Sequence, residues 1–95
     1  MDTPKPPSIT ITGTMLSNYA IYGIKPAHQT TEYRQSAYFC VLRDDGTSQR
    51  CAALGEPTKY QHLSVGGSQR VTFTGTEIRN IGALSYLIVE SGGEV

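Results

Sequence analysis

The segment 38–53 constrains the fold of this chain more than any other part of it. Two strand-like runs, rich in apolar and aromatic residues, flank the dipeptide Asp45-Gly46. Asp-Gly favours a two-residue turn with positive φ at both positions, so we expect a tight β-hairpin. In the register of such a turn, Cys40 lies opposite Cys51.

This register separates two chemically different faces of the hairpin, one with both cysteines and one with both arginines. Because an arginine rarely lies in a small core, we expect the arginine face towards solvent and the cysteine face inward. Phe39 is then exposed beside Arg43 and Arg50, an arrangement that can stack a nucleobase and hold a phosphate. The expected inward residues are Tyr38, Cys40, Leu42, Gln49, Cys51 and Ala53, and the expected outward ones are Phe39, Val41, Arg43, Ser48, Arg50 and Ala52.

Length and charge limit the classes of function that fit the chain. Ninety-five residues suffice for one domain with a modest core, not for two lobes around a cleft. The formal net charge of zero argues against a protein that coats duplex DNA through bulk electrostatics, so nucleic-acid binding would have to be local.

The chain has no sequence motif of catalysis or metal binding. His28 and His62 have no nucleophile motif nearby, and Asp44 and Asp45 beside Gly46 are best explained as turn residues. Cysteine and histidine spacings do not match a zinc site. We therefore expect no enzymatic activity, no cofactor and no metal.

The sequence predicts a soluble, cytoplasmic protein without a membrane partner. It contains no apolar run near the roughly 20 residues that cross a bilayer, and its first residues lack the apolar core of a secretion signal. In such a compartment cysteines stay reduced. A disulfide between Cys40 and Cys51 is geometrically conceivable in the expected register, but we favour two reduced residues.

Composition and alternation divide the chain into a tail, a domain and a short end. Residues 1–7 hold three of the five prolines and are predicted to be a flexible tail, before a domain over 8–91 and a flexible terminus at 92–95. Period-two alternation predicts a first strand over 8–15. Gly13 within it indicates a bend or bulge that lets this strand join two sheet layers.

Three more elements follow the hairpin. Pro57 suits a first helical turn, and we expect a short helix over 55–63. Residues 69–76 alternate as a fourth strand, with Val71 and Phe73 inward. The apolar run 83–90 is a fifth strand.

Residues 17–36 show no sustained period and are expected to form a long loop. Tyr22, Lys25, Tyr33 and Arg34 interleave aromatic and cationic side chains there, which makes them secondary candidates for binding. The alternative is that the apolar residues of this loop fold back onto the core.

The order of these elements resembles the oligonucleotide/oligosaccharide-binding (OB) barrel, over about 80 positions. Residues 39–49 resemble strands two and three of the anticodon-binding barrels of class II aminoacyl-tRNA synthetases, and 63–75 is similar to a glycine-then-strand-four pattern common in the superfamily. Because the chain lacks the catalytic body of a synthetase, its similarity to small stand-alone single-stranded DNA-binding or primosomal accessory proteins is the more useful comparison. The resemblance implies an all-β, five-stranded Greek-key barrel with a short helix between strands three and four.

In barrels of this type, single strands cross strands two and three and contact the adjoining loops. The resemblance thus implies that Phe39 stacks a base, that Arg43 and Arg50 contact phosphates, and that Arg79 contributes from the loop between strands four and five. This loop has no aromatic residue, which departs from the usual pattern of several stacking platforms.

We therefore predict a protein that binds single-stranded nucleic acid, with DNA slightly favoured over RNA. The alternative is a protein-interaction module with Phe39 and Val41 at the centre of a docking patch and Arg43 and Arg50 at its rim. A role in DNA replication or plasmid transfer, with a protein partner from that process, suits either. A homodimer through an exposed strand edge is a further expectation, with the strand 8–15 as the candidate edge.

Overall fold

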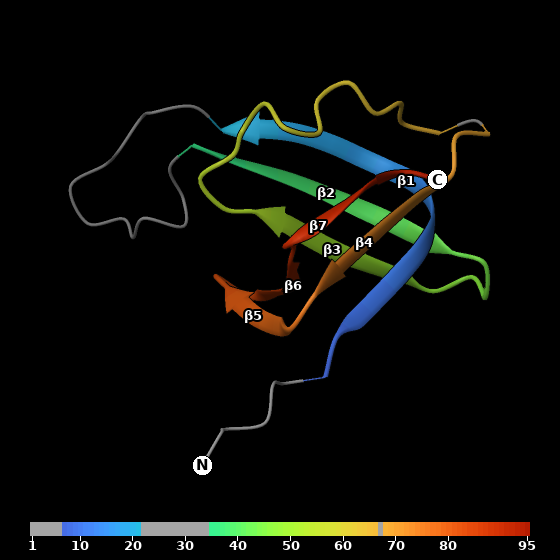
Figure 1. Ribbon diagram of the computed structural model, residues 1–95. Coiled ribbons are helices and arrows are strands. Elements are labelled where there is room, and N and C mark those ends of the chain that lie inside the picture. Colours follow the sequence, from blue (N-terminus) through green and yellow to red (C-terminus); the bar gives the residue numbers. More distant parts are fainter. Residues whose placement is uncertain (1–6, 22–34, 67) are drawn as a thin grey trace, which may run out of the picture.

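The computed structural model describes residues 7–21, 35–66 and 68–95, and all its regular elements in these ranges are strands (Figure 1). They form one mixed sheet in the order β5-β6-β3-β2-β1-β4-β7, in which only the β3–β6 pair is parallel. The all-β prediction is confirmed, whereas the five-stranded barrel with a helix is not. The strands are β1 (Ile9–Ile21), β2 (Ser36–Arg43), β3 (Ser48–Ala53), β4 (Val71–Gly75), β5 (Glu77–Ile81), β6 (Leu84–Ile88) and β7 (Ser91–Glu94).

β1 takes part in two ladders, as the glycine within it predicts. Its first part pairs with β4 and its second part with β2, and Gly13 belongs to both ladders. A Cβ at Gly13 would collide with the carbonyl oxygen of Leu42, so the crossing strands require glycine here. A register shift between Met15 and Ser17 then leaves Leu16 as a bulge.

Two predictions about this first strand are wrong. β1 continues to Ile21, beyond the predicted end at Met15, because β2 supplies backbone partners for residues that lack an alternating pattern. It is also not an edge of the sheet, since β2 and β4 flank it and the terminal strands are β5 and β7.

The β2–β3 loop is one residue longer than predicted. The amide of Arg43 donates to the carbonyl oxygen of Thr47 (2.8 Å), and the amide of Gly46 donates back to Arg43 (3.1 Å). Asp44, Asp45 and Gly46 therefore form a three-residue loop, with Gly46 at φ 90°. Asp45 closes it by accepting from the amide and hydroxyl of Thr47, which confirms the turn role of this aspartate.

This extra residue exchanges the two faces of β2 relative to the prediction, because side chains alternate with period two. Phe39 pairs with Cys51, and Cys40 pairs with Arg50. Phe39 is 2% exposed and lies in the core, so the prediction that it is exposed is wrong. The cysteines lie on opposite faces of the sheet and no disulfide joins them.

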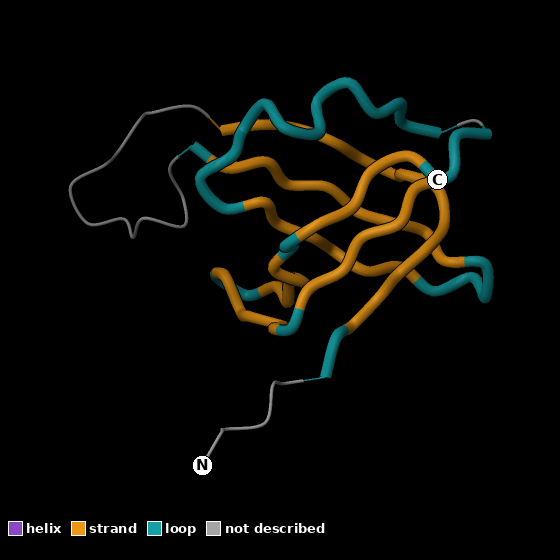
Figure 2. The backbone as a smooth tube through the Cα atoms, viewed as in Figure 1, coloured by secondary structure: helices purple, strands orange, loops and turns teal. Residues whose placement is uncertain are grey.

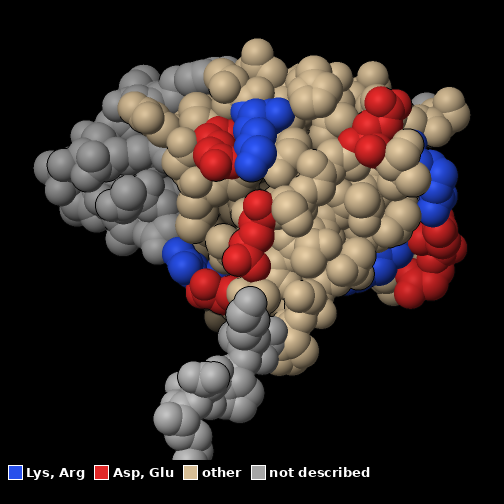
Figure 3. All heavy atoms as spheres, in the orientation of Figure 1, with Lys and Arg blue, Asp and Glu red and all other residues tan. Residues whose placement is uncertain are grey.

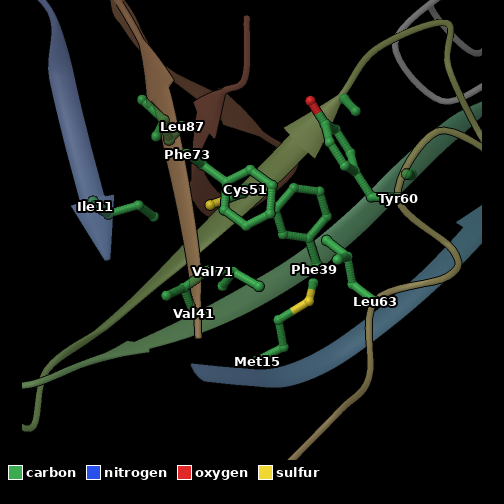
Figure 4. Packing of buried hydrophobic residues seen from close by; sticks show 12 residues of the cluster. Ile11, Met15, Phe39, Val41, Cys51, Tyr60, Leu63, Val71, Phe73 and Leu87 are labelled. Atoms are coloured by element: carbon green, nitrogen blue, oxygen red, sulfur yellow. The ribbon is translucent and has the colours of Figure 1, made fainter. Parts of the chain in front are cut away.

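The core lies between β2 and β3 on one side and β4 on the other, as the curled sheet brings these strands across each other (Figures 1 and 4). The rings of Phe39 and Phe73 lie 4.5 Å apart between centroids, and Tyr60 meets them edge-on at 5.5 and 5.2 Å. Val71 and Phe73 are both fully buried, which confirms their predicted orientation.

The segment predicted as a short helix forms consecutive turns instead (Figure 2). Its hydrogen bonds run from Lys59 to Glu56, from Gln61 to Thr58 and from Leu63 to Tyr60, each spanning three residues. Tyr60 and Leu63 are buried against the core, and the Asn18 side-chain amide of β1 donates to both of their carbonyl oxygens. These contacts hold the turns closed over the end of the core, without a helix.

The C-terminal part contains two strands that the sequence analysis does not predict. The sequence predicts Arg79 in the loop between strands four and five, yet Arg79 lies within β5, which forms a hairpin with β6. Residues 92–95 were expected to fray, yet β7 pairs with β4 from Ser91 to Glu94. The predicted tail lies outside the described residues, except Pro7.

Candidate nucleic-acid interface

A ladder of three tyrosines crosses the outer face of the sheet, opposite the core. Tyr19 of β1 pairs with Tyr38 of β2, and their rings stack at 5.7 Å with an interplanar angle of 29°. Tyr86 of β6 meets Tyr38 edge-on at 5.5 Å and 69°. Tyr38 and Tyr86 are buried, whereas Tyr19 is 54% exposed, so its ring is the one that faces solvent. Such pairs hold their rings in fixed orientations.

A second row of outward residues crosses the sheet next to Tyr19 and Tyr38 and shares Tyr86 with the ladder. The strand registers align Ser17 of β1 with Cys40 of β2, then Arg50 of β3, Tyr86 of β6 and Arg79 of β5. Because Ser17 and Cys40 are small, the surface is hollowed between the tyrosines and the neighbouring strands.

The hollow is a half-open cavity of about 110 Å³. Among the described residues, Tyr19, Tyr38 and Tyr86 border it, Ser17, Phe39 and Cys40 lie next to them, and Arg50 and Leu84 also line it. It therefore combines aromatic surface, a serine hydroxyl, a thiol and a guanidinium group, on four strands of one sheet.

Most described cations are paired with carboxylates. Lysine and arginine atoms lie beside aspartate and glutamate atoms on the face shown in Figure 3. This face therefore carries no extended patch of positive or of negative charge. Asp44 accepts two hydrogen bonds from Arg70, which together with the charge of Arg70 lower the pKa of this carboxyl. The ion pairs are Lys59–Glu56, Arg70–Asp44 and Arg79–Glu77.

Arg50 differs from these cations. It is exposed and, within residues 7–21, 35–66 and 68–95, no carboxylate forms an ion pair with it. Arg50 lines the cavity and is exposed to solvent, so its guanidinium group can pair with an anion from solution, and its planar fork suits a phosphate.

The predicted site residues do not form one cluster. Arg50 lies on the outer face as predicted and lines the cavity, but Phe39 points into the core and Arg43 lies on the opposite face of the sheet from Arg50. Arg43 donates to Thr47 and Gln49 instead. Arg79 is part of β5, with its charge compensated by Glu77, and shares a register row with Tyr86. The loop candidates Tyr22, Lys25, Tyr33 and Arg34 lie outside the described residues.

Sequence reasoning missed the tyrosine ladder because of the hairpin register. A two-residue turn predicts Tyr38 on the inward face, and the run 83–90 predicts only an apolar strand around Tyr86. Asp44-Asp45-Gly46-Thr47 also fits a three-residue loop with glycine in the left-handed position, and this signal would have placed Tyr38 outward.

The two thiols have different environments. Burial, together with the nearby Cys40, raises the pKa of the Cys51 thiol to about 12. Cys40 is half-buried at the cavity. Among the residues whose positions the structure gives, no group of His, Cys, Asp and Glu side chains could hold a metal ion, and none of the elements is a helix that could cross a membrane.

Comparison of the chain with protein-family models, with curated proteins and with solved structures finds no match. The outer face of the sheet, with its tyrosine ladder and Arg50, is therefore the feature of the molecule that bears on function.

Proposed function

We propose that the protein binds single-stranded nucleic acid, DNA slightly in preference to RNA, across the outer face of β1, β2, β3 and β6. The observation that carries this proposal is the tyrosine ladder beside Arg50. Bases stack on aromatic rings regardless of sequence, and a guanidinium neutralises the phosphate that follows. We propose binding alone, without a catalysed reaction.

Tyr19 is the principal stacking platform in this proposal. Its ring is half-exposed and is supported from below by Tyr38, so a base that stacks on it extends an existing stack. Tyr38 and Tyr86 fix the orientation of that ring, which reduces the conformational entropy lost on binding. Arg50, two strands away, then contacts the backbone.

We further infer that the sheet is an OB-type barrel in which β4 and β5 count as one bent strand. Only Thr76 separates these strands, β4 pairs with β1, and β5 pairs with β6. After β6, the amide of Glu90 donates to the carbonyl oxygen of Thr74 in β4 (2.8 Å). A Cβ at Gly75 would collide with the carbonyl oxygen of Ile88, so β4 and β6 approach closely at this point. The outer face of β2 and β3 is the usual ligand surface of such barrels.

Fluorescence anisotropy with labelled single-stranded and duplex oligonucleotides, at low and moderate salt, tests the function. Tyr19→Ala should weaken single-strand binding by about 1–3 kcal/mol, the usual contribution of one stacking platform. Arg50→Gln should weaken it too, and should reduce the salt slope by about 0.7, the contribution of one phosphate contact.

Matched controls separate this face from the rest of the surface. Ile78→Ala removes an exposed apolar side chain of β5, and Lys59→Gln removes a cation of the turn segment. Both should bind like the wild type. Absence of single-strand binding at low salt, or equal losses in the controls, would contradict the proposal.

A protein-docking surface is the second candidate, and the exposure of Tyr19 and Leu84 beside Arg50 favours it. Exposed aromatic, aliphatic and arginine side chains are typical of binding hot spots between proteins. Binding to a protein partner would tolerate salt that releases nucleic acid. A pull-down at moderate salt with wild type and Tyr19→Ala distinguishes the two.

A further inference from the structure

One side of the cavity beside the tyrosine ladder is held in place by packing. Ser17 and Cys40, which are paired residues of neighbouring strands, line the cavity together with Phe39. Tyr38 and Tyr86 are 3% and 8% exposed and pack against each other, so this wall cannot retreat without disturbing the second apolar cluster of the protein.

Leu84 differs from these walls. It lies two residues before Tyr86 on β6 and therefore on the same face of the sheet. Its side chain is 40% exposed and does not belong to either buried cluster. It limits the cavity from the β5–β6 hairpin, and its truncation would enlarge the cavity without removing a buried contact.

The volume of the cavity fits one six-membered ring. An enclosed apolar cavity of about 150 Å³ takes up benzene. The cavity here, about 110 Å³ and open to solvent, can hold such a ring with one edge left outside. A purine carries a second fused ring that exceeds that space, and we infer that this ring would meet Leu84, which lines the cavity from β6.

We propose that this cavity holds one pyrimidine base of the bound strand and that Leu84 sets the size limit that disfavours purines. The inference rests on the proposed function. The hydroxyl of Ser17 supplies a donor inside the cavity, and cytosine, thymine and uracil each carry a carbonyl oxygen at C2 that can accept from it. Arg50 remains at the mouth for the phosphate of the same nucleotide.

The test compares oligo(dT), oligo(dC) and oligo(dA) of equal length by anisotropy, with the wild type and Leu84→Ala. The wild type should bind both pyrimidine oligonucleotides about tenfold more tightly than oligo(dA), the range expected for one misfit in a hydrophobic pocket. In Leu84→Ala the ratio should fall to about twofold or less, through tighter binding of oligo(dA). Ile78→Ala should keep the wild-type ratio, because Ile78 does not border the cavity.

A second variant changes the lining of the cavity on β1. Ser17→Leu fills it from β1 and should lower the affinity for oligo(dT) to that for oligo(dA). Circular dichroism confirms that each variant is folded.

The outcomes distinguish the two proposals. Equal affinity of the wild type for all three oligonucleotides overturns the inference and leaves single-strand binding intact. A pyrimidine preference that stays unchanged in both Leu84→Ala and Ser17→Leu also overturns it, because the preference would then come from the self-stacking of adenine tracts. No binding of any oligonucleotide overturns the proposed function and the inference with it.

Discussion

Substitution of Phe39 by alanine tests the hairpin register on which the whole interface depends. With the observed three-residue loop, Phe39 lies between Phe73 and Tyr60 in the core and is 2% exposed. With a two-residue turn it would lie on the surface, and Cys40 would take the core position. With the three-residue loop, the Phe39→Ala variant should be less stable than Cys40→Ala. With a two-residue turn, this order should be reversed.

The expected magnitude follows from the contacts of the ring. Phe→Ala in a core costs about 3–5 kcal/mol, through lost burial and the cavity left behind. For a domain of this size that lowers the melting temperature by roughly 12–40 °C, and removes a large part of the 5–15 kcal/mol by which domains are usually stable. Phe39→Leu keeps much of the volume but loses two aromatic contacts, which contribute about 0.5–1.5 kcal/mol each.

The assay is urea unfolding followed by far-UV circular dichroism, since the chain has no tryptophan. Cys40→Ala is the matched control, because the neighbouring side chain is half-buried on the outer face and should cost less than about 1 kcal/mol. A stable Phe39→Ala that has lost oligonucleotide binding, together with a strongly destabilised Cys40→Ala, would refute the register and restore Phe39 to the interface.

Two further predictions concern titratable groups. At pH 8 a maleimide should modify only Cys40 in the folded protein and both cysteines in urea, because burial raises the pKa of Cys51 to about 12. If oligo(dT) protects Cys40 from the maleimide, the bound strand covers the cavity. Arg70 lowers the pKa of Asp44 below the ordinary 3.8, so this pair contributes stability above that pH and loses it as the pH falls through the lowered pKa. Asp44→Asn should therefore be less stable than the wild type at pH 7 and equally stable at low pH in urea unfolding, and a difference that persists at low pH would contradict this role.

The local patterns of the sequence were sufficient for several elements. Val71 and Phe73 point inward as their alternation predicts, because period two is a property of the strand backbone itself. Gly13 was recognised as the point where one strand joins two ladders, since only a residue without Cβ permits that approach. Arg50 was correctly placed on the outer face.

The remaining errors arise where distant contacts decide between local alternatives. Residues after Met15 have no alternation, and β1 continues only because β2 pairs with them. Pro57 and its neighbours tolerate a helix, but the burial of Tyr60 and Leu63 and the hydrogen bonds from Asn18 hold the segment in turns. Propensity is a weak preference that such contacts override.

The sequence by itself determined an all-β chain, its main strand segments and a hairpin closed by Asp45 and Gly46. Only the tertiary structure decided which face of that hairpin is buried. Loops of two and three residues are both compatible with this turn sequence, and they differ by one residue in register. The core selects the second, because it buries Phe39 against Phe73 and leaves Tyr38 to form the outer ladder. One residue of loop length therefore decides which side chains form the candidate interface. The free energy that favours the longer loop comes from the burial of Phe39 against Phe73, which is distant in the sequence.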